Sequence, residues 1–179
     1  MLIRLIVLLA LFASAPVAAQ APRDIPAQVA AMNEIAFLKG RWLGRGLRKP
    51  PSGPDYSYAQ TLVVEGKSSG LVMTIEGLSI RHDPTSGKPG TGSFAVVMYD
   101  EREKKYLFRS FGFGELIGAT GELIRPGVFQ WTTAGPMMLR FVVDGTQPNL
   151  WRETGERSSD GGKTWSPTHS LTAWRIDTR

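Results

Sequence analysis

Residues 37–46 read Phe-Leu-Lys-Gly-Arg-Trp-Leu-Gly-Arg-Gly, and the spacing of apolar residues along the chain changes within this stretch. Before it, apolar residues repeat at helical spacing. After it, apolar runs are short, and Gly, Pro, Asp and Ser interrupt them at regular intervals. Gly40 suits the position just past a helix end, because glycine accepts the left-handed backbone that ends many helices. The stretch therefore marks the passage from one helix into a series of strands.

One short helix is predicted over residues 26–38. Asp24 can cap its start, and Pro26 is tolerated in the first turn because the first backbone N–H groups of a helix lack partners. Val29 and Met32 then share one face at helical spacing. We expect this helix to precede the first strand.

The rest of the chain divides into about ten segments with the length and composition of strands. The turns between them contain Gly, Pro and Asp, which supply the fixed or positive φ that tight connections require. In one segment, Phe129 and Trp131 alternate with Gln130 and Thr132, as in a strand with one apolar face. The expected strands are residues 41–48, 56–66, 69–79, 93–99, 104–112, 115–123, 127–133, 137–144, 149–158 and 164–175.

The short connections between these strands force neighbours to pair antiparallel. An up-and-down order of about ten strands closes most simply as a barrel, because closure removes the open sheet edges. A barrel of roughly eight to ten strands has room for side chains and one small ligand. The sequence therefore predicts an all-β fold, an antiparallel up-and-down barrel of about ten strands with a short N-terminal helix.

The Gly-x-Trp and Gly-x-Gly of residues 40–46 resemble the opening of calycin barrels, a group that includes lipocalins, fatty-acid-binding proteins and nitrobindin-like haem barrels. The pattern of a bacterial family of secreted domains of unknown function, with a lipocalin-like fold, is similar over nearly all of residues 35–175. The resemblance implies a calycin-like barrel domain over residues 26–179, but no activity, because one fold hosts many functions. The matching stretches include Val96-Val97-Met98-Tyr99-Asp100, Tyr106-Leu107-Phe108-Arg109 and Gly161-Gly162-Lys163-Thr164-Trp165.

The same resemblance implies structural roles for Gly40, Trp42 and Arg175. In lipocalins, the Trp of this motif plugs the narrow end of the barrel, and an Arg of the last strand lies against it. Arg175 is the matching residue here, in the predicted last strand. A cation–π contact of this kind is worth about 0.5–2 kcal/mol and ties the two ends of the chain together.

Residues 158–165 read Ser-Ser-Asp-Gly-Gly-Lys-Thr-Trp and match the Asp-box pattern of sialidase propellers. Asp160 is expected to accept backbone N–H bonds across a turn, and Trp165 to pack back on the hairpin. A propeller requires several copies at a fixed period, and the sequence contains one. The motif therefore predicts a structural hairpin rather than a glycosidase.

Six side chains are candidates for an internal ligand site. Arg109 shares a strand face with Leu107 and Phe111, which favours the interior, where a guanidinium can form two parallel bonds to a carboxylate. Outward placement is the ordinary alternative for any arginine on a barrel, and the aromatic candidates are equally well explained as core. The six candidates are Arg109, Arg140, Tyr58, Phe111, Trp131 and His169.

His169 is one of two histidines, and strand periodicity places it on the same face as Arg175. In nitrobindin-like barrels, a His close to the C-terminus ligates haem iron, so the resemblance makes His169 the candidate for a haem ligand. Residues 166–170 match that motif poorly, and a histidine packed in the barrel or at its rim is the competing interpretation. The sequence has no zinc-ligand spacing, nucleophile motif or phosphate loop, so no metal ligand and no catalytic residue is predicted.

The N-terminus predicts export. Residues 1–19 combine a short basic start, an apolar run and the small residues of a cleavage site. The apolar run is shorter than the roughly 20 residues that span a bilayer. We therefore expect a signal peptide over residues 1–19 and a leader over residues 20–25. The mature protein is expected in the periplasm or outside the cell, without a transmembrane segment.

The net charge of +5 is spread along the chain rather than gathered in the basic stripe typical of nucleic-acid binding. Three functions therefore compete. The first is an exported barrel that binds a small apolar or amphipathic molecule without obvious catalysis. The second is a haem protein or enzyme that uses His169, and the third is a filled barrel that acts as an interaction or structural protein. Cavity size distinguishes the first two functions from the third, because ligand pockets measure roughly 300 Å³ or more.

Overall fold

The computed structural model describes residues 23–82, 90–112 and 114–177 of the 179-residue chain. It contains a helix, α1 (Ile25–Glu34), and two short 3₁₀ helices, η1 (Ala36–Leu38) and η2 (Ser68–Gly70). The strands are β1 (Gly40–Arg48), β2 (Tyr56–Lys67), β3 (Val72–Arg81), β4 (Thr91–Asp100), β5 (Lys105–Gly112), β6 (Glu115–Arg125), β7 (Val128–Thr133), β8 (Met138–Asp144), β9 (Leu150–Ser158) and β10 (Ser166–Arg175).

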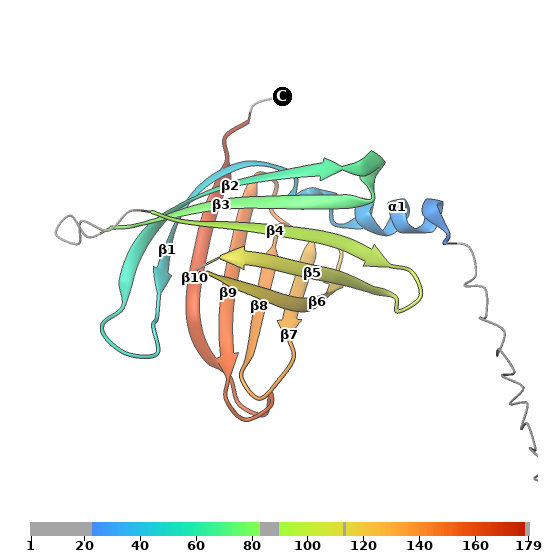
Figure 1. Cartoon of the computed structure of the whole chain (residues 1–179). Helices are drawn as coiled ribbons and strands as arrows, with labels where there is room; N and C mark the ends of the chain where they lie inside the picture. Colours follow the sequence, from blue (N-terminus) through green and yellow to red (C-terminus); the bar gives the residue numbers. More distant parts are fainter. Residues whose placement is uncertain (1–22, 83–89, 113, 178–179) are drawn as a thin grey trace, which may run out of the picture.

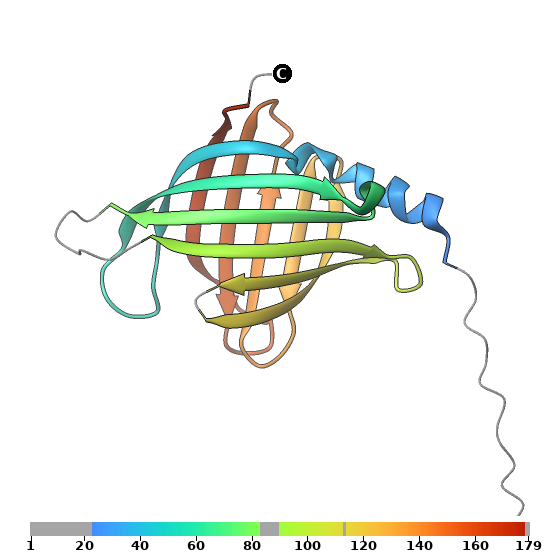
Figure 2. The same ribbon diagram turned by 45° about the horizontal axis from the view of Figure 1, so that its top comes forward.

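All ten strands belong to one closed antiparallel barrel, in the order β1-β10-β9-β8-β7-β6-β5-β4-β3-β2. Each strand pairs with its neighbours along the chain, and β1 closes the barrel by pairing with β10 from Trp42 to Arg48. In Figures 1 and 2, β2–β6 run across the front of the molecule, and β8–β10 cross behind them at a steep angle. The predicted up-and-down barrel with a short N-terminal helix is confirmed.

The N-terminal helix differs from the prediction at its C-terminal end. Asp24 caps it as expected, because its Oδ1 accepts a hydrogen bond of 3.0 Å from the backbone N–H of Ala27. The α-helix ends at Glu34, and the chain tightens into η1 before β1 begins at Gly40. Strand β3 also begins later than predicted, because η2 occupies the turn after β2.

The barrel has two unlike ends. Helix α1 contacts β4 and η2 and lies at the end where β2 turns into β3, which we call the closed end (Figure 1). Met32 of α1, Leu38 of η1 and Ile35 between them bring apolar side chains into the core at this end. The opposite end carries the connections β1–β2, β7–β8 and β9–β10, and we call it the open end. The candidate site described below lies toward the open end.

The β9–β10 connection forms the hairpin that the Asp-box motif predicts. Asp160 Oδ1 accepts hydrogen bonds of 2.9 Å from the backbone N–H groups of Lys163 and Thr164. The Trp165 indole N–H donates to the carbonyl oxygen of Gly162 at 3.0 Å, which folds the ring back on the turn. The hydrogen bond from the Thr164 hydroxyl is the main cause that lowers the pKa of the Asp160 carboxyl far below its usual value.

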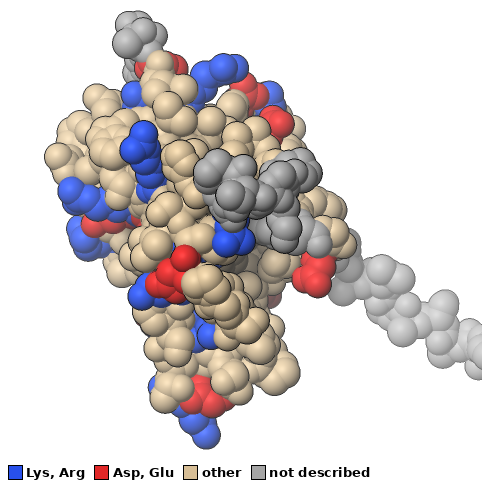
Figure 3. Space-filling model, turned by 90° about the vertical axis from the view of Figure 1, so that its left-hand side faces the viewer, with Lys and Arg blue, Asp and Glu red and all other residues tan. Residues whose placement is uncertain are grey.

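Charged side chains are dispersed on the face that Figure 3 shows, with Lys and Arg in separate small groups and Asp and Glu among them. Within the described part of the chain, no helix has the length and hydropathy needed to cross a bilayer. The expected signal peptide lies outside the described residues, as does most of the leader. The domain boundaries therefore stay predictions.

Candidate functional site

Trp42 and Arg175 seal the closed end. Trp42 is 3% exposed, and its indole N–H donates a hydrogen bond of 3.0 Å to the carbonyl oxygen of Leu38. The Arg175 guanidinium lies 4.3 Å from the centroid of the Trp42 ring, measured from Cζ. The same guanidinium donates from Nη1 to the carbonyl oxygen of Lys39 at 2.6 Å. The expected guanidinium–indole contact is therefore present.

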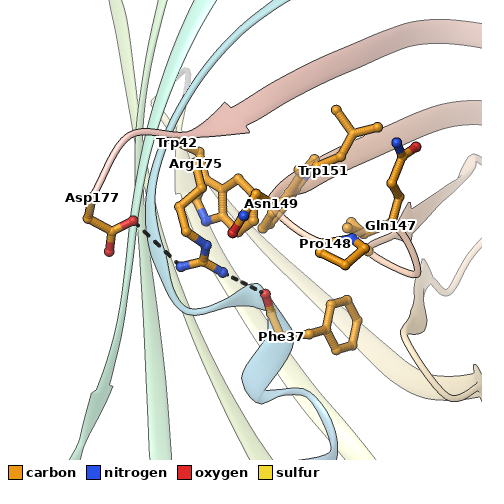
Figure 4. A pocket seen from close by; sticks show the side chains of 11 residues that line it. Phe37, Trp42, Gln147, Pro148, Asn149, Trp151, Arg175 and Asp177 are labelled. Atoms are coloured by element: carbon orange, nitrogen blue, oxygen red, sulfur yellow. Dashed lines mark hydrogen bonds and ion pairs between the residues drawn. The ribbon is translucent and has the colours of Figure 1, made fainter. Parts of the chain in front are cut away.

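Gly40 is needed beside Arg175 for two reasons. Its φ of +133° lies in a region that side chains disfavour, and a Cβ at this position would overlap the Arg175 guanidinium. A groove of about 590 Å³ opens next to Arg175, as Figure 4 shows. There Arg175 Nη1 lies 3.6 Å from Asp177 Oδ1, and Nη2 donates to the carbonyl oxygen of Phe37. The cation in this groove already has partners, which fits its structural role.

A chamber of about 200 Å³ lies inside the barrel, and all ten strands contribute to its wall. Most of the wall is apolar, while a band of hydroxyl groups comes from Ser79, Ser93 and Ser110. This combination of apolar surface with a few polar groups is typical of sites that bind small molecules.

Three stacked aromatic rings and one tilted imidazole form one side of this chamber. The ring centroids of Phe108 and Trp131 are 4.6 Å apart, and those of Trp131 and Phe141 are 3.8 Å apart, both in parallel stacks. The imidazole of His169 continues the series, 5.0 Å from the centroid of Phe141. The three aromatic rings make this side of the chamber apolar, and the imidazole adds a polar group at its end.

The polar end of the chamber is organised around Glu153. Its Oε1 lies 2.9 Å from His169 Nε2, and its Oε2 accepts a hydrogen bond of 3.0 Å from the Trp151 indole N–H. Tyr58 lies on the neighbouring wall, where its hydroxyl donates to the carbonyl oxygen of Ser170 at 3.2 Å. Burial, and then the negative charge of Glu153, raise the pKa of Tyr58 well above 10.0.

This raised pKa predicts a loss of stability at alkaline pH. Tyrosine ionises in the unfolded chain near pH 10, whereas folded Tyr58 keeps its proton, so its contribution is complete below pH 10 and falls above it. One such group accounts for at most about 1.4 kcal/mol of unfolding free energy per pH unit. Urea unfolding between pH 8 and 11 should therefore show a shallower decline in Tyr58→Phe than in the wild type. Equal slopes for the two proteins would contradict the assignment.

A second cavity, of about 500 Å³, lies at the open end, and we call it the mouth. The mouth adjoins the chamber, because Arg48 and Phe141 line both. The chamber alone is smaller than the roughly 300 Å³ at which pockets for drug-sized ligands begin. A ligand larger than the chamber therefore has to extend into the mouth.

The structure divides the six candidate ligand residues into two groups. Tyr58, Trp131 and His169 line the chamber. The other three, Arg109, Arg140 and Phe111, are absent from its lining and lie on the outer face of the barrel. The expectation of an inward Arg109 is wrong.

The reason lies in strand β5, which is apolar on both faces. Its inward face carries Tyr106 and Phe108, which are both buried, so Arg109 and Phe111 face outward. The exposed Arg109 donates from Nη1 to the neighbouring carbonyl oxygen of Phe108 at 2.9 Å. Phe111 is 50% exposed.

Arg140 is held on the outer face by two partners. Its Nη2 lies 2.6 Å from Glu156 Oε2, and its Cζ lies 4.1 Å from the centroid of the Trp165 ring. The inward positions of the same strand, β8, are taken by Phe141 and Val143. Arg140 therefore braces the β9–β10 hairpin and does not reach the chamber.

The polar residues around His169 were not predicted from the sequence; they are Glu153, Arg157 and Thr168. Pro167 was the available signal, because proline inside a predicted strand indicates an edge or a bulge. The register between β9 and β10 does shift between Pro167 and His169. Such a bulge changes which side chains face inward, and simple alternation could not anticipate it.

The surroundings of His169 do not fit a haem. Nε2 is held by Glu153, and Phe141 packs against the ring. On the Nδ1 side, the backbone of Gly155 is so close that even a Cβ there would overlap the imidazole. A macrocycle needs a wide clear space in front of a ring nitrogen, but Glu153 occupies that space at Nε2 and the β9 backbone narrows it at Nδ1. The chamber of about 200 Å³ is also small for a haem.

Neither a protein-family model nor a curated protein matches the chain. Among solved structures, Rv2717c from M. tuberculosis is 14% identical, over 82% of this chain and 98% of that one, with a TM-score of 0.59. The S-type phycobiliprotein lyase CpeS from Guillardia theta is 9% identical, over 88% of this chain and 100% of that one, with a TM-score of 0.59. At these identities, the likeness concerns the fold alone. The chain thus shares a lipocalin-like barrel fold with both proteins.

Proposed function

We propose that this protein binds a small apolar or amphipathic molecule, with the apolar part in the chamber and the other end in the mouth. The observation that carries the proposal is the junction of the two cavities, where Arg48 and Phe141 line both. A ligand seated there would move its apolar part out of water and against the stacked rings of the chamber. Burial of apolar surface contributes roughly 25 cal/mol per Å² to the free energy of binding. Binding rather than catalysis is the function that this geometry supports best.

The amphipathic character of the ligand is supported by the unlike chemistry of the two cavities. The rings of Phe108, Trp131 and Phe141 give the chamber an apolar wall. The mouth, by contrast, receives the cationic side chains of Arg48 and Arg157 in addition to apolar ones. A molecule with one apolar and one polar end would satisfy both surfaces.

Filling the chamber tests this proposal. Ser110 lines the chamber, so Ser110→Phe should place a ring inside it and weaken the binding of 1-octanol at least about tenfold, or 1.4 kcal/mol. Isothermal titration calorimetry with wild type and variant measures the two dissociation constants.

The matched control is Ser57→Phe, because Ser57 is exposed on the outer face of β2. This variant should bind 1-octanol within about twofold of the wild type, since surface changes away from a site have small effects. Equal binding of 1-octanol by Ser110→Phe and the wild type would rule out the chamber as the ligand site. No binding by the wild type would favour a filled barrel that acts through its surface.

Export is part of the same proposal. Residues 1–19 have the composition of a signal peptide, which would place the carrier in the periplasm or outside the cell. A mature N-terminus at Gln20, found by mass spectrometry of the protein from that compartment, is the expected result. Intact Met1 in a cytoplasmic fraction would contradict it.

A further inference from the structure

Three buried polar atoms lie where the chamber meets the mouth and have no hydrogen-bond partner among the described residues. They are Arg157 Nη1, Thr168 Oγ1 and His169 Nδ1, and His169 as a residue is only 6% exposed. Nearly all buried polar groups in proteins are hydrogen-bonded, because leaving one unpaired is costly. A cluster of unpaired groups therefore indicates a partner from outside the chain.

The bulge in β10 builds this cluster. Because the register shifts between Pro167 and His169, the consecutive side chains of Thr168 and His169 both reach the inner side of β9. They meet over Gly155, where a Cβ would lie 2.8 Å from Thr168 Oγ1 and would overlap the imidazole at Nδ1. Arg157 comes from the same strand as Gly155, two residues further on, and lines the mouth beside Thr168. The bulge thus brings Thr168 and His169 together over Gly155, and Arg157 shares the lining of the mouth with Thr168.

The charges at this point favour an anion. Arg48 and Arg157 both line the mouth, and neither forms an ion pair with a carboxylate among the residues that the structure describes. Glu153, the carboxylate of the chamber wall, already bonds His169 and Trp151. With Nε2 facing Glu153, Nδ1 is the nitrogen of His169 that remains for a ligand, and it donates when it carries a proton.

We infer that Arg157, Thr168 and His169 bind the carboxylate head group of a small amphipathic ligand whose apolar tail occupies the chamber. This inference rests on the proposed function and names the chemical class of its ligand. The planar guanidinium of Arg157 matches a carboxylate better than it matches a neutral hydroxyl. The Thr168 hydroxyl and the His169 N–H supply two further donors, and Arg48 adds a second positive charge at the mouth.

Paired ligands test the head-group site. Octanoate and 1-octanol have chains of the same length and differ in the carboxylate. Calorimetry on the wild type should show octanoate binding at least about tenfold tighter, a difference of 1.4 kcal/mol. Arg157→Gln should lose this preference, because the guanidinium bonds a carboxylate more strongly than a neutral hydroxyl, so octanoate binding weakens more than 1-octanol binding. Thr168→Val, which is nearly isosteric, should weaken octanoate binding more than 1-octanol binding.

The control variant is Arg152→Gln, which removes the same charge from the exposed face of the same strand. It should keep the preference for octanoate, because its guanidinium is directed away from the chamber. A loss in Arg152→Gln equal to that in Arg157→Gln would reduce the effect to overall charge and overturn the site.

Thermal unfolding of the free variants separates binding from structure. Because Arg157 Nη1 has no partner in the described part of the chain, Arg157→Gln should leave the melting temperature unchanged or raise it. A lower melting temperature together with weaker binding of both ligands would make Arg157 a structural residue and overturn the inference. Binding of 1-octanol with no preference for octanoate would overturn the head-group site alone. Binding of neither ligand by the wild type would overturn the proposed function itself.

Discussion

Replacing Trp42 by alanine is expected to lower the free energy of unfolding by about 3–5 kcal/mol, the range found when large buried rings are truncated. The indole is 3% exposed, meets Trp151 edge-on at 5.6 Å between ring centroids, and bonds the carbonyl oxygen of Leu38. Its loss leaves a cavity at the closed end and removes the surface on which Arg175 lies. Guanidinium unfolding followed by far-ultraviolet circular dichroism measures the change.

Trp174→Ala is the matched control for Trp42→Ala. Trp174 lies on β10, one residue from Arg175, and is 55% exposed. Its truncation should lower the free energy of unfolding by less than about 1 kcal/mol, because little buried contact is lost. Equal losses in the two variants would show that Trp42 does not seal the barrel.

The second large effect is expected at Gly155, where alanine should lower the free energy of unfolding by about 1–3 kcal/mol, as is usual for overpacking. The new methyl group would overlap Cε1 and Nδ1 of His169 and lie 2.8 Å from Thr168 Oγ1. Turning His169 aside breaks its contact with Glu153. The same variant should therefore lose the preference for octanoate over 1-octanol, which calorimetry measures.

Gly92→Ala provides the comparison for Gly155→Ala. A Cβ at Gly92 meets no heavy atom within 4 Å, and the residue lies in β4 without positive φ. The substitution should leave stability unchanged or raise it by up to about 1 kcal/mol, because alanine reduces the freedom of the unfolded chain. If Gly155→Ala behaved like Gly92→Ala, the close packing of His169 over β9 would be refuted.

The two ends of the barrel have different roles in these predictions: the closed end stabilises the fold, and the open end binds the ligand. At the closed end, Trp42 and Arg175 have partners for their polar groups, and their roles are structural. At the open end, Arg157 and Thr168 hold polar atoms that no described residue satisfies. Unpaired groups reduce stability and are typical of binding sites, where a ligand completes them.

Strand β5 shows what the alternation of residues along a strand can and cannot predict. Period two correctly places Arg109 with Phe111 on one face and Phe108 with Ser110 on the other. Both faces are apolar, however, so the pattern does not say which one turns inward. The inward face is chosen by packing, because Phe108 stacks on Trp131 from another strand. A local pattern therefore predicted the strand and missed the orientation of its arginine.

Four features could be predicted from the amino-acid sequence: the helix, the ten antiparallel strands, the Trp42–Arg175 contact and the Asp160 hairpin. These features follow from chemistry within a few residues, such as turn residues and alternation, or from a motif that the resemblance supplied. The bond between His169 and Glu153, and the position of Thr168 next to His169 over Gly155, became visible in the folded barrel alone. That arrangement depends on a register shift between two strands, and register is set by packing across the barrel rather than by residues adjacent in the chain.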